Sequence, residues 1–258
     1  MMDWLVDTLV WTAALIALVL VLRRPVAKHF GPQMAYALWA LPVARLFLPP
    51  IELPAWMAPS QSLPAGPAIA DEAGSAFYVV EYGPATEAAA PSLLDTLPLA
   101  EILLVAWLTG FAAFLFVRFR NYARMRELML DGSVEVGRSG KVRLVETRAT
   151  NAPLAFGVRD KVVALPEGFM AQHDRGLRDL ALAHELAHHR GHDILANFMA
   201  QPLFALHWFN PLGRVGWLAM RRDQEAACDA RVVQSRAPEE RAASATLGPA
   251  AKLAITLA

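Results

Sequence analysis

Three long apolar runs divide the first half of the chain. The first extends from Trp4 to Leu22, with Asp7 as its one charged residue. The second extends from about Phe30 to Leu48 and contains Arg45, and the third extends from Leu97 to Val117. A helix of about 20 apolar residues spans the hydrocarbon core of a bilayer. The pattern therefore predicts three transmembrane helices, over about 4–22, 30–48 and 97–117.

Basic residues follow the first and third runs and predict the topology. Arg23 and Arg24 follow the first run, whereas a signal peptide carries its positive charge before the apolar stretch. Residues 49–96 are rich in Pro and Ala and contain acids but no Lys or Arg. By the positive-inside rule, the N-terminus and the 49–96 loop lie outside, and residues 118–240 lie in the cytoplasm.

The cytoplasmic residues predict a small α+β domain. Three β-type runs, Val134–Val136, Lys141–Val145 and Lys161–Leu165, are separated by Gly and Pro and predict a small antiparallel sheet. We expect the last run to offer an edge to which an extended substrate segment binds. Asp174 is a suitable N-cap for a helix over Arg175–Arg190. The fold class is thus a mainly α integral membrane protein with a cytoplasmic α+β domain.

The composition narrows the functional classes. Basic and acidic residues number 24 each and make up 19% of the 258 residues, so the chain lacks the positive charge of a nucleic-acid-binding protein. Hydrophobic residues make up 55%, above the roughly 45–50% of soluble domains, which points to the lipid bilayer as a partner. The single cysteine, Cys228, excludes a disulfide-stabilised secreted domain and is expected to be a small buried side chain.

The most informative motif is His184-Glu185-Leu-Ala-His188, on the helix predicted over Arg175–Arg190. Residues four apart project from one helix face, so both imidazoles can bind one metal ion, and zinc suits this site best. Glu185 can then act as the general base that deprotonates the attacking water. The alternative interpretation is that these residues form the polar face of an ordinary helix and bind no metal. A third ligand is therefore needed to support a catalytic zinc site.

Two acids on a later helix, which is predicted from about Gly213, supply the further groups. Glu225 and Asp229 stand one turn apart. Glu225 can complete the zinc site while Asp229 accepts the ring N–H of a ligand histidine. Asp193 is interpreted as a residue that caps or tethers the end of the zinc helix, and His189 as a solvated or paired side chain.

The apolar segment Ile194–Phe209 lies between the two metal-binding helices. It is short for a membrane span. A crossing would also place Glu225 on the opposite side of the membrane from His184, which is incompatible with a shared zinc ion. We therefore interpret the segment as a helix buried in the domain or lying at the membrane surface.

These segments resemble the BlaR/MecR family of membrane metallopeptidases. The resemblance is specific in five stretches, Pro153–Gly157, Val163–Pro166, His184–Asp193, His207–Pro211 and Arg222–Asp229. It implies a gluzincin-type site in a bacterial inner membrane. One catalytic zinc ion would be held by His184, His188 and Glu225, with Glu185 as the base.

The resemblance also implies a signalling role. The best-known members sense β-lactams through a C-terminal extracellular domain and trigger cleavage of a DNA-bound repressor. In this sequence residues 241–258 form only a short apolar tail. We expect either a chain truncated before a further membrane helix or a separate protein that supplies the sensor.

The leading hypothesis is an integral-membrane zinc endopeptidase that cleaves a cytoplasmic protein, either a transcriptional repressor or the chain itself, as the output of transmembrane signalling. One alternative is a quality-control protease of the HtpX or CAAX-prenyl-protease kind. Another is a non-catalytic transducer that zinc merely stabilises, although a structural zinc site needs no general base such as Glu185. The expected partners are a protein substrate, lipid, and a second copy of the chain as a homodimer, with no direct contact to nucleic acid.

Overall fold

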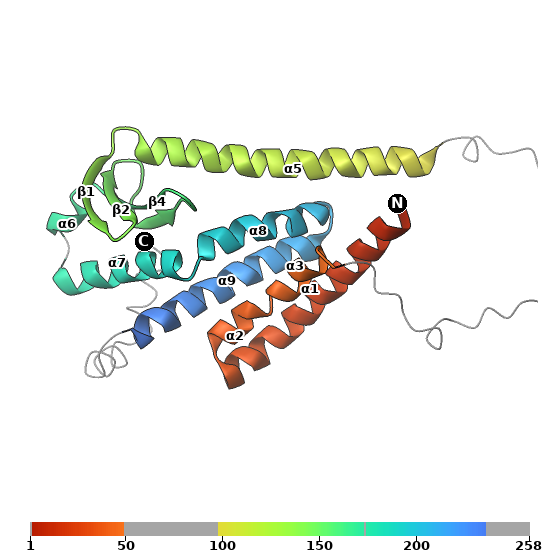
Figure 1. Cartoon of the computed structure of the whole chain (residues 1–258), viewed down its shortest axis with the longest axis horizontal. Helices are drawn as coiled ribbons and strands as arrows, with labels where there is room; N and C mark the ends of the chain where they lie inside the picture. Colours follow the sequence, from red (N-terminus) through yellow and green to blue (C-terminus); the bar gives the residue numbers. More distant parts are fainter. Residues whose placement is uncertain (1, 49–97, 173, 236–258) are drawn as a thin grey trace, which may run out of the picture. The chain divides into compact units, whose positions relative to one another are not determined.

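The computed structural model describes residues 2–48, 98–172 and 174–235 (Figure 1). The 49–96 loop and the 241–258 tail lie outside the described residues. The chain divides into two compact units, residues 1–48 with 108–258 and residues 49–107. The elements are α1 (Met2–Phe30), α2 (Pro32–Ala37), α3 (Ala40–Arg45), α5 (Leu99–Leu130), β1 (Val134–Ser139), β2 (Val142–Thr147), β3 (Leu154–Phe156), β4 (Lys161–Pro166), α6 (Phe169–Gln172), α7 (Arg175–Arg190), α8 (Asp193–Leu206) and α9 (Pro211–Gln234).

Among the residues that the structure describes, two helices, α1 and α5, are long and apolar enough to span a membrane. The spanning stretches are Trp4–Phe30 and Leu99–Leu130. None of residues 99–130 is buried. By contrast, α1 buries Thr8, Thr12 and Ile16, which follow one another at one-turn spacing and form one face. Helix α1 therefore packs against other helices along that face.

The predicted span over about 30–48 is described as two short helices, α2 and α3, so a third membrane span is not confirmed. Gly31 has φ of +90°, in the left-handed region that favours glycine, and it ends α1 before Pro32 begins α2. Arg45, buried in this apolar run, is paired with Asp7 of α1 at 2.6 Å. The break and the ion pair explain why the run folds back against α1.

The sheet is mixed, so the prediction of an antiparallel sheet is wrong in part. Its strand order is β1-β2-β4-β3. Strands β1/β2 and β3/β4 pair antiparallel, whereas β2 and β4 pair parallel, with Val142 opposite Lys161. The sequence pattern missed the three-residue strand β3. Because β3 turns back into β4, the chain enters β4 in the same direction as β2.

Strand β4 is the centre of the domain formed by the sheet and α7. Its residues Val162 to Leu165 are fully buried, as expected for a strand covered on both faces. On one face Val163 and Leu165 pack against α7 through Leu182 and Leu186. On the other face the sheet packs against Tyr122, Met125 and Met129 near the end of α5. The sheet thus connects the zinc-motif helix α7 to a membrane helix.

A second core joins the membrane helices to α8 and α9. Figure 1 shows α8, α9 and α1 running side by side. Their shared core consists of buried apolar side chains from α1, the α2–α3 segment, α8 and α9, namely Ile16, Val19, Trp39, Ala200, Leu203, Phe204, Ala219 and Met220. Helix α9, which carries Glu225, is therefore fixed directly against the first membrane helix.

The turn after β3 provides a test of the sheet. Gly157 has φ of +86°, and a Cβ there would lie 1.9 Å from the Asp160 carbonyl oxygen, whereas Gly132 has φ of +61° with nothing within 4 Å of its Cβ position. Left-handed backbone alone costs about 1–2 kcal/mol for alanine. We expect Gly157→Ala to lower the melting temperature of the detergent-purified protein clearly more than Gly132→Ala. Equal shifts would contradict this description of the turn.

Candidate metal centre

Helix α7 presents the zinc motif. The helix begins and ends at the predicted residues, and the Asp174 carboxylate caps it by accepting a hydrogen bond from the Gly176 N–H at 2.7 Å. His184 and His188 stand one turn apart, with their rings edge to face and 4.8 Å between centroids. Their Nε2 atoms are 3.2 Å apart. The two nitrogens therefore converge on one point.

Helix α9 brings Glu225 to the same point. Glu225 Oε2 lies 3.5 Å from His184 Nε2 and 3.4 Å from His188 Nε2. With the 3.2 Å separation of the two nitrogens, the three atoms form a nearly equilateral triangle. Ligand atoms bound at about 2.0–2.1 Å to a tetrahedral zinc ion are themselves about 3.3 Å apart. The triangle fits one such ion with its fourth position open.

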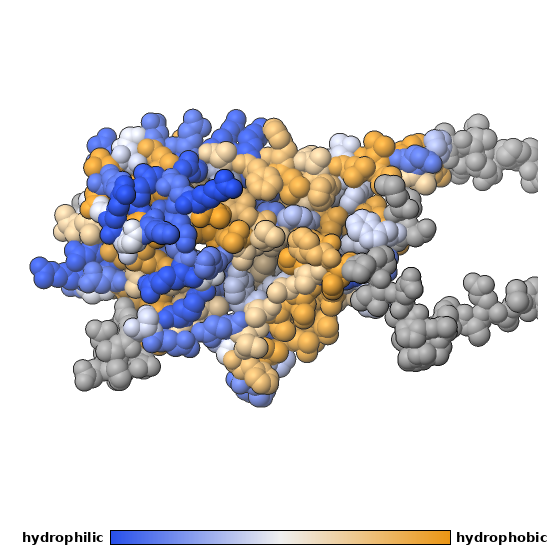
Figure 2. All heavy atoms as spheres, viewed as in Figure 1, coloured by the Kyte–Doolittle hydropathy of each residue, from blue (hydrophilic) through white to orange (hydrophobic). Residues whose placement is uncertain are grey.

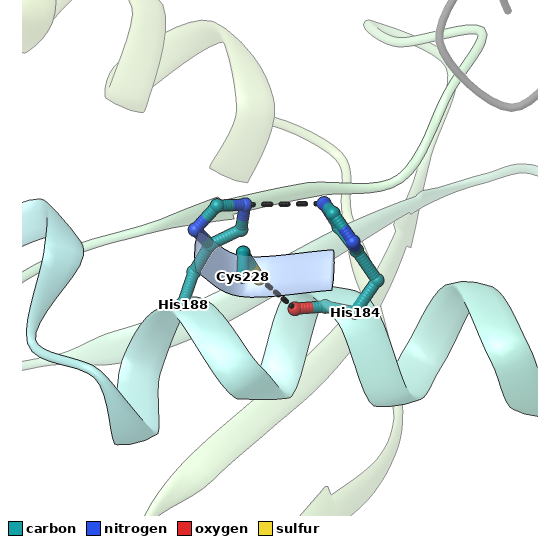
Figure 3. A group of neighbouring side chains, drawn as sticks. All are labelled: His184, His188 and Cys228. Atoms are coloured by element: carbon teal, nitrogen blue, oxygen red, sulfur yellow. Dashed lines mark hydrogen bonds between the residues drawn. The ribbon is translucent and has the colours of Figure 1, made fainter. Parts of the chain in front are cut away.

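Cys228 lies close to the two imidazoles but faces another way. One ligand atom from each of His184, His188 and Cys228 falls within a common 4.8 Å. The buried thiol is directed at the His184 carbonyl oxygen, 3.4 Å away. Figure 3 shows it on the helix side of the rings, while the Nε2 atoms face each other across the opposite side. Because Glu225 Oε2 lies within 3.5 Å of both Nε2 atoms, its carboxylate is the third group that faces them.

Each imidazole has a carboxylate partner at its other nitrogen. Asp229 Oδ1 lies 3.2 Å from His184 Nδ1, and Asp193 Oδ2 lies 2.8 Å from His188 Nδ1. The sequence predicted both acids beside the metal ligands, Asp229 as the partner of a ligand histidine and Asp193 as the residue that caps or tethers the end of the zinc helix. Such partners fix the tautomer of a ligand histidine, with Nε2 free for the metal.

The carboxylates make the centre strongly attractive to positive charge. The hydrogen bond that the His184 ring donates to Asp229 is the largest cause that raises the pKa of His184, to about 12. Burial opposes charge on His188, but its hydrogen bonds to Asp193, Cys228 and Glu225 together outweigh the effect of burial and raise the pKa of His188 to about 11. Burial likewise opposes charge on Glu225, yet the two histidines hold its pKa well below its usual range. A cation between these groups is favoured, whether it is a proton or a metal ion.

Glu185, which the sequence predicts to be the base, lies against strand β3. Burial raises the pKa of its carboxyl group above the usual range. Its Oε2 accepts a hydrogen bond from the backbone N–H of Ala155 in β3, at 2.7 Å. Because β4 is paired on both sides, the predicted docking edge at Lys161–Leu165 is wrong. The free edge next to the motif belongs to β3.

Comparison with known proteins gives the family. The family model for the BlaR1 peptidase M56 matches residues 4–247, nearly the whole chain. The chain belongs to the M56 peptidase family. No curated protein matches it. Membership implies a membrane-associated peptidase or signal transducer of the metallopeptidase type.

In this M56 peptidase, two groups around the centre were not foreseen from the sequence. Arg231 of α9 donates to the buried Asp193 carboxylate and so holds it against His188. Gln224 is fully buried, and its amide donates to Tyr36 Oη at 2.7 Å and to the Asp193 carbonyl at 3.1 Å. Only the proximity of Gln224 to Glu225 in the sequence could have drawn attention to it.

His189 and Asn210 of the M56 peptidase have structural positions. His189 is buried and its Nε2 lies 3.0 Å from the Val162 carbonyl oxygen, so it is paired, as one of the two expectations had it, and it joins α7 to β4. Asn210 caps α9 by accepting from the Leu212 N–H at 2.9 Å. Neither side chain belongs to the metal triangle.

The Asp193–Arg231 pair should contribute to stability without any metal. Asp193 is 1% exposed, and removing one partner of a buried pair costs about 3 kcal/mol or more. We expect Asp193→Asn to lower the free energy of unfolding of the chelator-treated protein by that amount. The matched control is Glu167→Gln, which breaks the exposed pair with Arg148 and should leave the free energy of unfolding almost unchanged. A similar loss of unfolding free energy in both variants would contradict the view that the buried Asp193–Arg231 pair stabilises the protein.

Proposed function

We propose that the protein is an integral-membrane zinc endopeptidase that cleaves a cytoplasmic protein as the output of transmembrane signalling. The observation that carries this proposal is the triangle of His184, His188 and Glu225, with Glu185 beside it. Its edges match those of a three-ligand zinc site with one open position. A structural zinc site commonly has four protein ligands and needs no adjacent base, so the non-catalytic transducer is less well supported.

The side chains around the triangle have distinct roles in this proposal. Zinc bound there would lower the pKa of a water molecule and polarise the peptide carbonyl. Glu185 takes the proton from the attacking water and passes it to the leaving amine. Burial shifts the pKa of Glu185 upward, in the direction of neutral pH, which suits a carboxyl group that must both accept and donate a proton. Asp193 and Asp229 keep the histidine rings oriented.

The free edge of β3 is the proposed docking site for the scissile segment. The Ala155 N–H is directed to Glu185 rather than to β4. An extended peptide added along β3 would take over this N–H through one of its own carbonyls and release the Glu185 carboxylate. Binding of the peptide to β3 would then release the Glu185 carboxylate in the same step, beside the metal triangle.

The substrate class follows from the topology and the family. The basic flanks of α1 and α5 favour a cytoplasmic position for the sheet and α7. The M56 match supports a membrane-associated signalling peptidase, and the substrate that we propose for it is a repressor or the chain itself. It also favours this function over a quality-control protease of the HtpX or CAAX-prenyl-protease kind.

Three substitutions separate metal binding from catalysis. Glu185→Gln should retain zinc and lower cleavage by at least about 10²-fold, because only the base is lost. His188→Ala and Glu225→Ala should lose the metal as well as activity. Zinc content by elemental analysis, self-cleavage and cleavage of β-casein are measured on the full chain in membranes.

The combination of zinc content and cleavage in these variants tests the ligand and base assignments. Zinc retained in all three variants would show that the ligands are wrongly assigned. Equal cleavage by wild type and Glu185→Gln would exclude the proposed base.

A further inference from the structure

Helices α8 and α9 form a hairpin whose two open ends lie at the metal centre. Helix α8 begins at Asp193, which contacts His188, and α9 returns past Glu225. Figure 1 shows the two helices side by side, joined at the end away from α7 and the sheet. A helix of 14 residues is about 20 Å long at about 1.5 Å per residue. The tip, residues 207–210, is therefore about 20 Å from the metal centre.

The tip lies at the depth of the membrane spans. His207 Nε2 is 2.8 Å from Thr12 Oγ1, well inside the Trp4–Phe30 span of α1. A Cβ added at Gly110, inside the α5 span, would lie 2.2 Å from the Trp208 ring. The absence of a side chain at Gly110 thus allows the indole to lie directly on α5. The hairpin tip is in contact with both spanning helices.

Most of the exposed side chains of the hairpin at this depth are apolar, with Arg214 in the first turn of α9 as the charged exception, and further charged side chains follow outside it. Phe209, Val215 and Leu218 are each about half exposed. Val215, Leu218 and Arg222 follow at helical spacing on one face of α9, so this face changes from apolar to charged between Leu218 and Arg222. Figure 2 shows a matching division, with hydrophobic residues over α1 and hydrophilic residues over the sheet and α7.

Several backbone polar groups of the tip are paired within the protein. The Trp208 N–H donates to the Ala205 carbonyl at 3.2 Å, and the Asn210 N–H donates to the His207 carbonyl at 2.9 Å. Asn210 itself accepts from two backbone N–H groups at the start of α9. Non-helical backbone is tolerated at membrane depth only when such groups have partners. The turn meets that requirement.

From these contacts we propose that α8 and the first half of α9 form a re-entrant hairpin whose exposed apolar side chains contact lipid acyl chains. A 14-residue helix is shorter than the roughly 20 residues that cross a bilayer, but a hairpin needs only to enter and return. This path keeps Glu225 on the same side as His184. The continuity of the apolar surface with α1 favours lipid over a protein partner.

The ion pair between α1 and α9 marks where the hairpin leaves the bilayer. Arg23, the first basic residue after the apolar part of α1, donates to Asp223 through Nε and Nη2 at 3.1 and 2.6 Å. Glu225 follows two residues later, about 3 Å further along the axis at about 1.5 Å per residue. The metal centre therefore lies at the membrane surface, where a chain segment close to the membrane can reach it.

Lipid contact can be measured one residue at a time along α9. Cysteine is introduced singly at Phe209 and Leu218, and at the exposed positions Arg222 and Ala226 as matched controls on the same helix. The full chain carries Glu185→Gln, so self-cleavage does not interfere. Each variant is labelled with bimane and reconstituted into phosphatidylcholine vesicles with or without a lipid that bears a doxyl quencher on its acyl chain. Protein without an added cysteine corrects for Cys228, which is buried.

We expect the doxyl lipid to remove most of the fluorescence at positions 209 and 218 and little at 222 and 226. Equally weak quenching at all four positions would overturn the proposal and place the hairpin in water or beneath a protein partner. Quenching at 209 and 218 that disappears when protein is concentrated in the vesicles would show that a second copy covers the face, which also overturns it. None of these results depends on peptidase activity.

Discussion

Close packing of α7 on α9 determines where every group of the metal centre lies. Ala187, Cys228 and Val232 form the small core between the two helices. Because Ala187 and Cys228 are small and almost completely buried, the helices approach closely enough for Glu225 to face both imidazoles. A larger side chain at either position would separate the histidines from the carboxylate. The position of the proposed ligands therefore depends first on the close packing of α7 against α9, and only then on their charges.

Helix α9 is held at the same time by α1 and the α2–α3 segment. Asp223 accepts hydrogen bonds from Arg23 and from Trp39 Nε1, the latter at 2.8 Å. The next residue, Gln224, joins Tyr36 to the backbone of Asp193. The residues immediately before Glu225 are thus fixed to α1 and the α2–α3 segment. A displacement of those segments in the membrane would be carried directly to the metal centre, which suits a peptidase that responds to a transmembrane signal.

The local features of the site follow from the sequence, because they depend on residues close together in the chain. Asp174 and the helical period give the bounds of α7, and the one-turn spacing of His184 and His188 gives the shared face. Asp193 is different, since its position on His188 depends on the reversal at His192, which adopts φ of +57°. The parallel pairing of β2 with β4 and the salt bridge from Arg231 are likewise set by contacts distant in sequence. The two short helices α2 and α3 were missed because their composition matches that of a span.

The central claim is that His184, His188 and Glu225 hold zinc while Cys228 does not. X-ray absorption at the zinc edge of the purified, zinc-loaded protein tests it directly, because zinc–sulfur bonds of about 2.3 Å are distinct from zinc–nitrogen and zinc–oxygen bonds of about 2.0–2.1 Å. The account predicts a first shell of nitrogen and oxygen alone. A sulfur scatterer would contradict it and make Cys228 a ligand.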